Sequence, residues 1–225
     1  MRPALLFDVN ETLLDLRALD APFKRVFGDA SARAGWFALM LQISFVGALT
    51  GDYVDFTAAQ HAALRMLAER MGITLTDADA DEIVGTMSRL PAHADVPRSL
   101  ERLAAAGFRL ATLTNSLESV VEAQLASAGI RHHFERALSA DAARRLKPAP
   151  EPYRMAAAEL GIPVEETCLV AAHAWDVAGA LAAGCQAAFV ARPGALLYPV
   201  GRRPQFVGRD LIEVADRLIE RWPAG

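Results

Sequence analysis

Four short apolar runs, separated by longer helical patterns, constrain the fold of this sequence more than any other feature. They lack polar alternation and end at a polar residue or a turn, as buried parallel strands do; they are Ala4–Phe7, Leu110–Leu113, Cys168–Ala172 and Ala187–Ala191. The helical patterns around them, most of them followed by glycine, are Val96–Ala106, Leu117–Ala128, Pro152–Leu160, Ala174–Ala183 and Asp210–Arg221. Strands that alternate with helices predict an α/β fold with a doubly wound parallel sheet.

The stretch from Leu16 to about Arg89 breaks this alternation. It contains helical patterns, such as Phe56–Met71 and Asp77–Met87, and no convincing strand. Because it begins a few residues after the first strand, it should lie over the carboxyl ends of the strands, where ligands bind in such sheets. The predicted domains are a Rossmann-like core, residues 1–14 and 91–225, and a helical cap, residues 15–90.

The composition excludes several classes of protein. The chain has 225 residues, 53% of them hydrophobic, with 23 Lys and Arg against 27 Asp and Glu. Such a chain can bury a sizeable core, and the lack of a basic cluster argues against a nucleic-acid partner. Cys168 and Cys185 lie far apart without CxxC spacing, so neither a disulfide framework nor a zinc site is indicated. Small-molecule chemistry is the expected role.

No segment predicts export or membrane insertion. The apolar run before Asp8 is too short for the h-region of a signal peptide. The longer apolar stretch Trp36–Leu49 contains polar residues and glycine and falls short of the roughly 20 residues that span a bilayer, so it predicts a buried helix. We expect a cytoplasmic protein in a reducing compartment, without a membrane partner.

Asp8 lies at the carboxyl end of the first predicted strand. An unperturbed Asp has a pKa of about 3.9, so at neutral pH its carboxylate can attack an electrophile without a base to activate it. An Asp at this place can also simply cap the turn that follows. Asp8 is therefore a candidate nucleophile whose role depends on its neighbours.

Polar side chains at the ends of other predicted strands should reach the same edge of the sheet. Thr114 and Asn115 follow the second run, His173 and Asp176 follow the third, and Lys147 lies in a loop between them. Each alone is weak evidence, because Thr114 or Asn115 can cap a helix and Lys147 can be a solvated loop residue. Together they predict an active site at this edge.

These motifs resemble those of the haloacid dehalogenase superfamily, and the resemblance covers the whole chain. The matching motifs are Phe7-Asp8-Val9-Asn10-Glu11-Thr12-Leu13, Thr114-Asn115, Lys147-Pro148 and Asp176. Two segments resemble the L-2-haloacid dehalogenases in particular, Lys147-Pro148-Ala149-Pro150-Glu151-Pro152-Tyr153 and Ala174-Trp175-Asp176. The resemblance implies the core-and-cap architecture, with the active site at its junction.

The resemblance also implies a reaction, the hydrolysis of a short (S)-2-haloalkanoate to an (R)-2-hydroxy acid. Asp8 would attack C2 and expel the halide, and water would then cleave the resulting ester at the Asp8 carboxyl carbon. Lys147 would hold Asp8 ionised. Thr12 and Asp176 would fix these two groups, and Thr114 would hold the substrate carboxylate. Further candidates for substrate contact are Val9, Asn10, Trp36, Phe37, Asn115, Tyr153 and Trp175.

Apart from water, the resemblance implies neither a cofactor nor a metal, and it implies a homodimer. Phosphatases of the superfamily have a second Asp where this chain has Asn10, which cannot protonate a leaving alkoxide. Asp176 also lacks an acidic neighbour to complete a Mg²⁺ site. Because a halide leaves without a proton, Asn10 favours the dehalogenase, and a metal-dependent phosphatase is the first alternative.

Glu11 and His173 depart together from the dehalogenase pattern, which more commonly has Gly and Asn at these places. We hypothesise a dyad in which Glu11 takes a proton from one imidazole nitrogen while the other nitrogen activates water to hydrolyse the ester. In the alternative interpretation, Glu11 pairs with an arginine of the cap and His173 is merely a satisfied core histidine.

Phe37 stands where the family has a cap arginine that helps to hold the halide. Candidate replacements are Asn115, Arg33 and the ring edges of Trp36, Phe37 and Trp175, since ring edges carry partial positive charge. The stripe Trp36–Phe45 is equally compatible with an ordinary cap core, and most residues like Arg33 are solvated. Phe37 and Ala171, which replaces a Ser, leave a non-catalytic binding protein on this scaffold as the second alternative.

Overall fold

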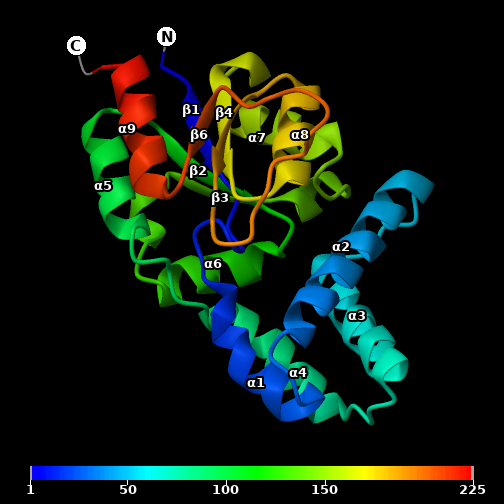
Figure 1. Ribbon diagram of the computed structural model, residues 1–225. Helices are drawn as coiled ribbons and strands as arrows, with labels where there is room; N and C mark the ends of the chain where they lie inside the picture. The colour runs from blue at the N-terminus through cyan, green and yellow to red at the C-terminus, as the bar shows by residue number, and fades with distance from the viewer. Residues whose placement is uncertain (1, 224–225) are drawn as a thin grey trace.

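The computed structural model describes residues 2–223 and contains one parallel sheet flanked by helices (Figure 1). The strands lie in the order β3-β2-β1-β4-β5-β6. Their bounds are β1 Ala4–Phe7, β2 Leu110–Thr114, β3 Arg136–Ser139, β4 Thr167–Ala171, β5 Gln186–Val190 and β6 Phe206–Gly208. The order reverses between the central strands β1 and β4, which confirms the predicted doubly wound α/β fold.

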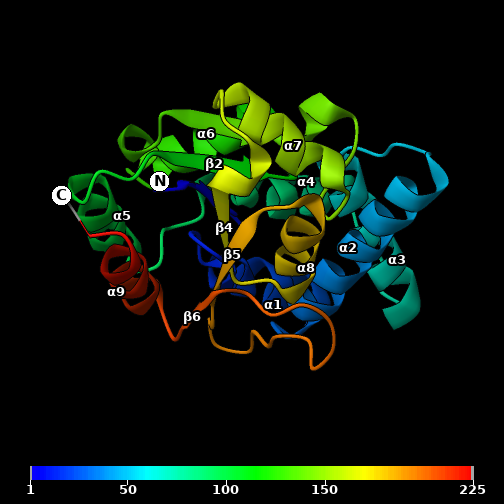
Figure 2. The same cartoon turned by 90° about the horizontal axis from the view of Figure 1, so that it is seen from above.

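Helices cover both faces of the sheet (Figure 2). In β1, Leu5 and Phe7 belong to one hydrophobic cluster, and Ala4 and Leu6 belong to another. The first cluster includes residues of α5, α6 and α9, and the second includes residues of α7 and α8, so β1 is buried on both sides. The helix bounds are α5 Val96–Ala105, α6 Glu118–Ser127, α7 Pro150–Glu159, α8 Ala174–Ala183 and α9 Leu211–Arg221.

Between Leu16 and Arg89 the chain forms helices and no strand, as the sequence predicts. These helices are α1 Asp20–Phe27, α2 Ala32–Thr50, α3 Phe56–Met71 and α4 Asp77–Thr86. We call residues 15–90 the cap and the remainder the core; the exact domain boundaries stay a prediction. Phe37 and Leu41 of the cap line the same pocket as Asp8 and Thr114, so the cap lies over the carboxyl ends of β1 and β2.

Short 3-10 helices connect several of these elements. Within residues 2–223 they are η1 Leu16–Leu19, η2 Met87–Arg89, η3 Arg131–His133, η4 Ala140–Ala143 and η5 Val164–Glu166. The first two mark the entry to the cap and the exit from it. The loop after η4 carries Lys147, whose peptide bond to Pro148 is cis.

Helix α2 differs from the buried helix that the sequence predicts. Trp36 and Met40 are fully buried in its first half, but Val46 is 51% and Leu49 is 86% exposed in its second half. The helix is 19 residues long and extends beyond the hydrophobic centre of the cap. By length and a mean hydropathy of 1.4 it could cross a membrane, although a packed helix meets the same criterion, and here α2 packs along α3.

The sequence does not predict β3 and β6, the two edge strands of the sheet. An edge strand has a neighbour on one side only, so it does not need the continuous apolar run of a central strand. Arg136 is exposed in β3, and β6 has three residues. Both strands owe their conformation to pairing with β2 and β5, which a local sequence pattern does not reveal.

A glycine in α8 lets this helix approach the loop that carries Lys147. A Cβ atom at Gly179 would lie 2.6 Å from Pro148 Cβ and 2.7 Å from Tyr153 Oη. We expect Gly179→Ala to lower the free energy of unfolding by about 1–3 kcal/mol. Gly85→Ala, in a helix with open space around it, should instead raise this free energy by about 0.5–1 kcal/mol. Denaturant unfolding checks both variants, and equal effects would contradict the close approach.

Candidate active site

The candidate site lies at the carboxyl ends of the central strands. Asp8 directly follows β1, Thr114 ends β2, and His173 comes two residues after β4. The Asp8 N–H donates to the carbonyl oxygen of Val170 in β4 at 3.0 Å. Asp8 is thereby fixed between two neighbouring strands, and parallel pairing brings the other strand ends to it.

Lys147 is fully buried and donates three hydrogen bonds. Its Nζ lies 2.9 Å from Asp8 Oδ1, 2.6 Å from Asp176 Oδ2 and 2.8 Å from the carbonyl oxygen of Leu113. An ammonium has three donors, so all of them are used. Burial acts to lower the pKa of Lys147, but the charges of Asp176 and Asp8 outweigh it and raise this pKa above its usual value. The site therefore contains a buried cation.

The second oxygen of Asp8 has two different partners. Asp8 Oδ2 accepts from Thr12 Oγ1 at 2.7 Å and lies 3.1 Å from His173 Nδ1. Thr12 is itself oriented, because its hydroxyl accepts from the Ala172 N–H at 2.9 Å. Burial acts to raise the pKa of Asp8, but the charge of Lys147 and the hydrogen bond to His173 hold it well below its usual range. Asp8 is an ionised carboxylate in a fixed orientation.

Asp176, in the first turn of α8, connects Lys147 to Tyr153. Tyr153 Oη donates to Asp176 Oδ1 at 2.5 Å. Burial raises the pKa of both side chains, and for Asp176 the charge of Lys147 opposes this shift. Within the described residues, neither side chain lines the pocket at Asp8. Asp176 orients Lys147 from outside the pocket, and Tyr153 orients Asp176.

His173 bridges two carboxylates. Its Nδ1 faces Asp8 Oδ2, and its Nε2 lies 2.9 Å from Glu11 Oε2. The ring also stacks on Phe37 and Trp175, with centroid distances of 5.6 and 5.2 Å. Burial acts to lower the pKa of His173, but the hydrogen bonds to Asp8 and Glu11 raise it to about 9. At neutral pH the ring is an imidazolium that donates from both nitrogens.

Glu11 contacts both partners that the sequence analysis treats as alternatives. Its Oε2 faces His173 in the core, and its Oε1 lies 3.7 Å from Nη1 of Arg33 in the cap. The φ angle of Glu11 is 61°, a left-handed conformation that costs a residue other than glycine about 1–2 kcal/mol. Such strain persists where surrounding contacts hold it, often at functional sites.

The two asparagines use their amides within the protein. Asn10 Oδ1 accepts from Gln124 Nε2 at 3.0 Å, and Asn10 Nδ2 donates to Ser116 Oγ at 3.3 Å. Asn115 Oδ1 accepts from the Lys147 N–H at 2.8 Å, and Asn115 Nδ2 donates to the Lys147 carbonyl oxygen at 3.1 Å. Asn115 therefore holds the backbone of Lys147 beside β2, a contact that the sequence does not predict.

A small pocket opens at Asp8. The sequence predicts most of its lining residues, which are Asp8, Asn10, Phe37, Thr114, Asn115, Lys147, His173 and Trp175. Leu41 and Phe56 of the cap complete the lining, and the sequence does not predict them because neither lies in one of the recognised motifs. Trp36 lies instead in the cap core, where its Nε1 donates to the Gln60 carbonyl oxygen at 3.0 Å, and Val9 is buried away from the pocket.

Arg192 is a further buried contact of the site that the sequence analysis misses. Its Nη2 donates to the Thr12 carbonyl oxygen at 2.8 Å, and its Nη1 donates to both carboxylate oxygens of Asp95 at 2.8 Å. Arg192 thus fixes the backbone of the residue that orients Asp8. The available signal is a charged residue directly after the predicted strand Ala187–Ala191.

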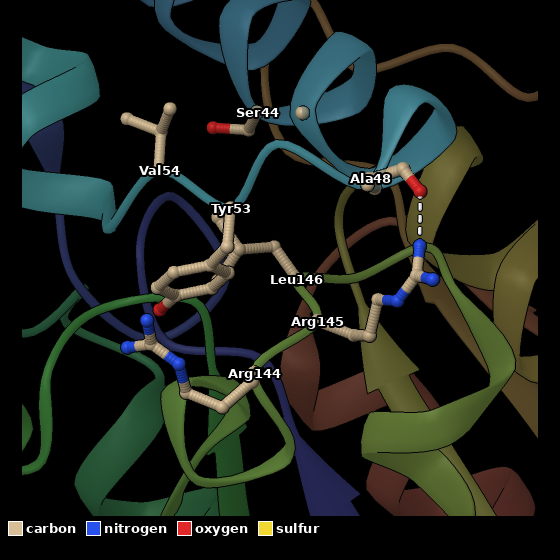
Figure 3. A pocket seen from close by; sticks show the side chains of 9 residues that line it. Ser44, Ala48, Tyr53, Val54, Arg144, Arg145 and Leu146 are labelled. Atoms are coloured by element: carbon tan, nitrogen blue, oxygen red, sulfur yellow. Dashed lines mark hydrogen bonds between the residues drawn. The ribbon is translucent and has the colours of Figure 1, made fainter.

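A second small pocket lies between the cap and the loop that precedes Lys147 (Figure 3). Tyr53 donates to Asp141, and the Arg144 guanidinium carbon lies 3.9 Å from the centre of the Tyr53 ring. Arg145 donates to the carbonyl oxygen of Ala48 at the end of α2. These contacts attach the cap to the loop that carries Lys147.

The cysteines are not part of the candidate site. Cys168 and Cys185 are buried, and both are free thiols. Burial raises the pKa of the Cys185 thiol to about 11, so it is protonated at neutral pH. Within residues 2–223, no group of three or more His, Cys, Asp or Glu side chains is arranged to hold a metal ion.

Comparison with known proteins gives the family of this fold and site. Residues 3–184 match the family described as haloacid dehalogenase-like hydrolase. The chain belongs to this family and is a hydrolase, which confirms the family resemblance drawn from the motifs.

Relatives and solved structures agree with this assignment. The (S)-2-haloacid dehalogenase of Pseudomonas putida is 26% identical over 218 residues, which are 96% of each chain. The haloacetate dehalogenase H-2 of Moraxella sp. (strain B) is 29% identical over 218 residues, also 96% of each chain. The structure of L-2-haloacid dehalogenase from Xanthobacter autotrophicus superimposes with a TM-score of 0.91 at 25% identity and covers 100% of both chains.

The raised pKa of His173 makes stability depend on pH. A group whose pKa is about 9 in the folded state and about 6.5 when unfolded stabilises the fold fully below pH 6.5. This contribution, on the order of 3 kcal/mol, is lost as the pH rises through 9. We expect the difference in unfolding free energy between wild type and His173→Asn to shrink by this amount between pH 6.5 and 10. Denaturant unfolding at several pH values checks it, and parallel pH curves would contradict the imidazolium.

Proposed function

We propose that the protein hydrolyses short (S)-2-haloalkanoic acids to (R)-2-hydroxyalkanoic acids through an ester on Asp8. The observation that carries this proposal is the ionised Asp8 held by buried Lys147 at the base of a small, mostly apolar pocket. A carboxylate in this state can displace a halide from C2 without an acid, and Asn10 supplies none. The named relatives, an (S)-2-haloacid dehalogenase and a haloacetate dehalogenase, support the same reaction.

The pocket offers donors for both ends of the substrate. Thr114 and the backbone N–H groups near it are proposed to hold the substrate carboxylate. The buried Trp175 Nε1 has no hydrogen-bond partner within residues 2–223, so its N–H is available to the departing halide. Because a buried donor without a partner is unfavourable, a halide that accepts this hydrogen bond is stabilised. Asn115 acts mainly on Lys147 and is a weaker candidate for this role.

Hydrolysis of the ester is assigned to His173 and Glu11. Alkylation turns Asp8 into a neutral ester, which removes one of the two carboxylates that raise the pKa of His173. The imidazolium then releases its Nδ1 proton to solvent, while the Nε2–H group keeps its hydrogen bond to Glu11. Nδ1 takes a proton from the attacking water and returns it to the leaving alkoxide, which yields the hydroxy acid and protonated Asp8. Transfer of that proton to Nδ1 restores the starting state.

The two alternatives have less support. A metal-dependent phosphatase needs an acid where the chain has Asn10, and the amide of Asn10 is occupied by Gln124 and Ser116. A non-catalytic binding protein does not require a strained Glu11 whose carboxylate is aimed at His173. Of the three functions, hydrolytic dehalogenation therefore has the most support.

We also propose that the protein works as a cytoplasmic homodimer. Val46 and Leu49 near the end of α2 are exposed apolar side chains that a second copy could cover.

Asp8→Asn tests the reaction itself. With EDTA present, wild type should release halide from (S)-2-chloropropionate and not from the (R) form, because attack from behind C2 requires one configuration in the pocket. Asp8→Asn should release chloride from the (S) form at least 1,000-fold more slowly than wild type, since an amide is a poor nucleophile. Ion chromatography of the released chloride measures both rates. Mg²⁺-dependent phosphomonoester hydrolysis without halide release would instead favour the phosphatase.

His173→Ala tests the second half of the reaction. We expect the variant to form the Asp8 ester but to hydrolyse it at least 100-fold more slowly, because the general base is removed. Intact-protein mass spectrometry after exposure to (S)-2-chloropropionate should show the added mass of the acid minus the halide. Asp8→Asn under the same conditions is the control and should stay unmodified. A fully active His173→Ala protein without the adduct would refute the dyad.

A further inference from the structure

The two carboxylate oxygens of Glu11 face different parts of the molecule. Oε2 contacts His173 Nε2 at 2.9 Å in the core, and Oε1 lies 3.7 Å from Arg33 Nη1 in the cap. The backbone carbonyl oxygen of Glu11 also lies 3.1 Å from His93 Nε2. Glu11 therefore connects Arg33 of the cap to His173, which in turn contacts Asp8.

Arg33 is held in place by the cap itself. Its Nε donates to Asp20 Oδ1 at 2.8 Å, and its side chain is 19% exposed. Asp20 is the first residue of α1 and Arg33 is the second residue of α2, so this ion pair joins the two helices near their N-termini. A guanidinium is planar with several donors, and it can serve two carboxylates at once. Arg33 thus presents a fixed charge to Glu11.

Arg33 is not placed to receive the halide. Among the described residues that line the pocket at Asp8, Arg33 does not occur, whereas Phe37, one turn further along α2, does. Its guanidinium is already shared between two carboxylates. The position of Arg33 therefore points to Glu11 and not to the substrate.

We propose that Arg33 is a positioning residue for hydrolysis of the Asp8 ester, acting through Glu11 on the orientation of His173. This inference rests on the proposed function. Alkylation uses Asp8 and Lys147, which Arg33 does not contact, so this step does not depend on it. Ester hydrolysis uses His173 Nδ1, whose alignment depends on the bond between Nε2 and Glu11. The cap thereby takes part in the second step.

The test separates the two steps in a single turnover. Wild type, Arg33→Gln and Arg33→Lys are mixed rapidly with (S)-2-chloropropionate and quenched, and chloride, 2-hydroxypropionate and the Asp8 ester are measured. We expect chloride release by Arg33→Gln within 2-fold of wild type, 2-hydroxypropionate formation at least 10-fold slower, and accumulation of the ester. Arg33→Lys should recover a large part of the hydrolysis rate, because it restores a cation beside Glu11.

Arg25→Gln is the matched control. Arg25 is also a cap arginine with two carboxylate partners, Asp79 and Glu82, but both partners lie in the cap. This variant should behave like wild type in both steps. If Arg33→Gln does not fold, as judged by circular dichroism, Asp20→Asn replaces it, because it loosens Arg33 without removing its charge, and a 2-fold to 5-fold slower hydrolysis is expected.

Three outcomes would overturn the inference. Equal slowing of chloride release and hydrolysis by Arg33→Gln would show a general structural role, and unchanged rates of both steps would show no role. Slowing of hydrolysis by Arg25→Gln as large as that by Arg33→Gln would show a non-specific effect of cap charge. A wild-type protein that releases no chloride would overturn the proposed function itself, and this result is distinct from the other three.

Discussion

The buried ammonium of Lys147 is the constraint on which the rest of the site depends. A fully buried cation is stable only with opposite charge and hydrogen bonds around it. Its partners come from distant parts of the chain, since Asp8 follows β1, Asp176 lies in α8 and the Leu113 carbonyl belongs to β2. The sheet order β2-β1-β4 brings these elements together. The arrangement of the site is therefore set by the fold of the core.

Charge balance extends this network outward to the cap. Lys147 faces two carboxylates, His173 bridges Asp8 and Glu11, and Arg33 meets Glu11. These contacts join three anions to three cations, and Arg33 has a further carboxylate partner, Asp20, on the side of the cap. Of the three cations, the imidazolium alone loses its proton within a few pH units of neutrality. In the proposed reaction, the group that changes charge thus lies between Asp8 and the cap, which gives a physical reason for Glu and His to occur together.

The sequence predicts the central part of this structure better than its periphery. The central strands appear as apolar runs because both faces of the sheet are covered, and polar residues at their ends predict that Asp8, Lys147 and His173 meet. The sequence pattern does not predict the edge strands β3 and β6, because their conformation depends on distant partners. For the same reason the sequence leaves a cap arginine and His173 as competing partners of Glu11, whereas the structure places Arg33 at one carboxylate oxygen and His173 at the other. Which oxygen faces which group is a property of the packed cap.

The same balance explains how a halide could leave a pocket that has Phe37 in place of an arginine. In the proposed displacement, negative charge moves from Asp8 to the halide, and the total charge of the site does not change. Lys147, whose charge Asp8 helps to neutralise before the reaction, then faces a neutral ester and attracts the departing anion from a short distance in the pocket. The Trp175 N–H, which has no partner within residues 2–223, is the proposed directional donor to the halide. A cation that first holds the nucleophile can therefore also stabilise the leaving group, so the missing guanidinium is not required for neutrality.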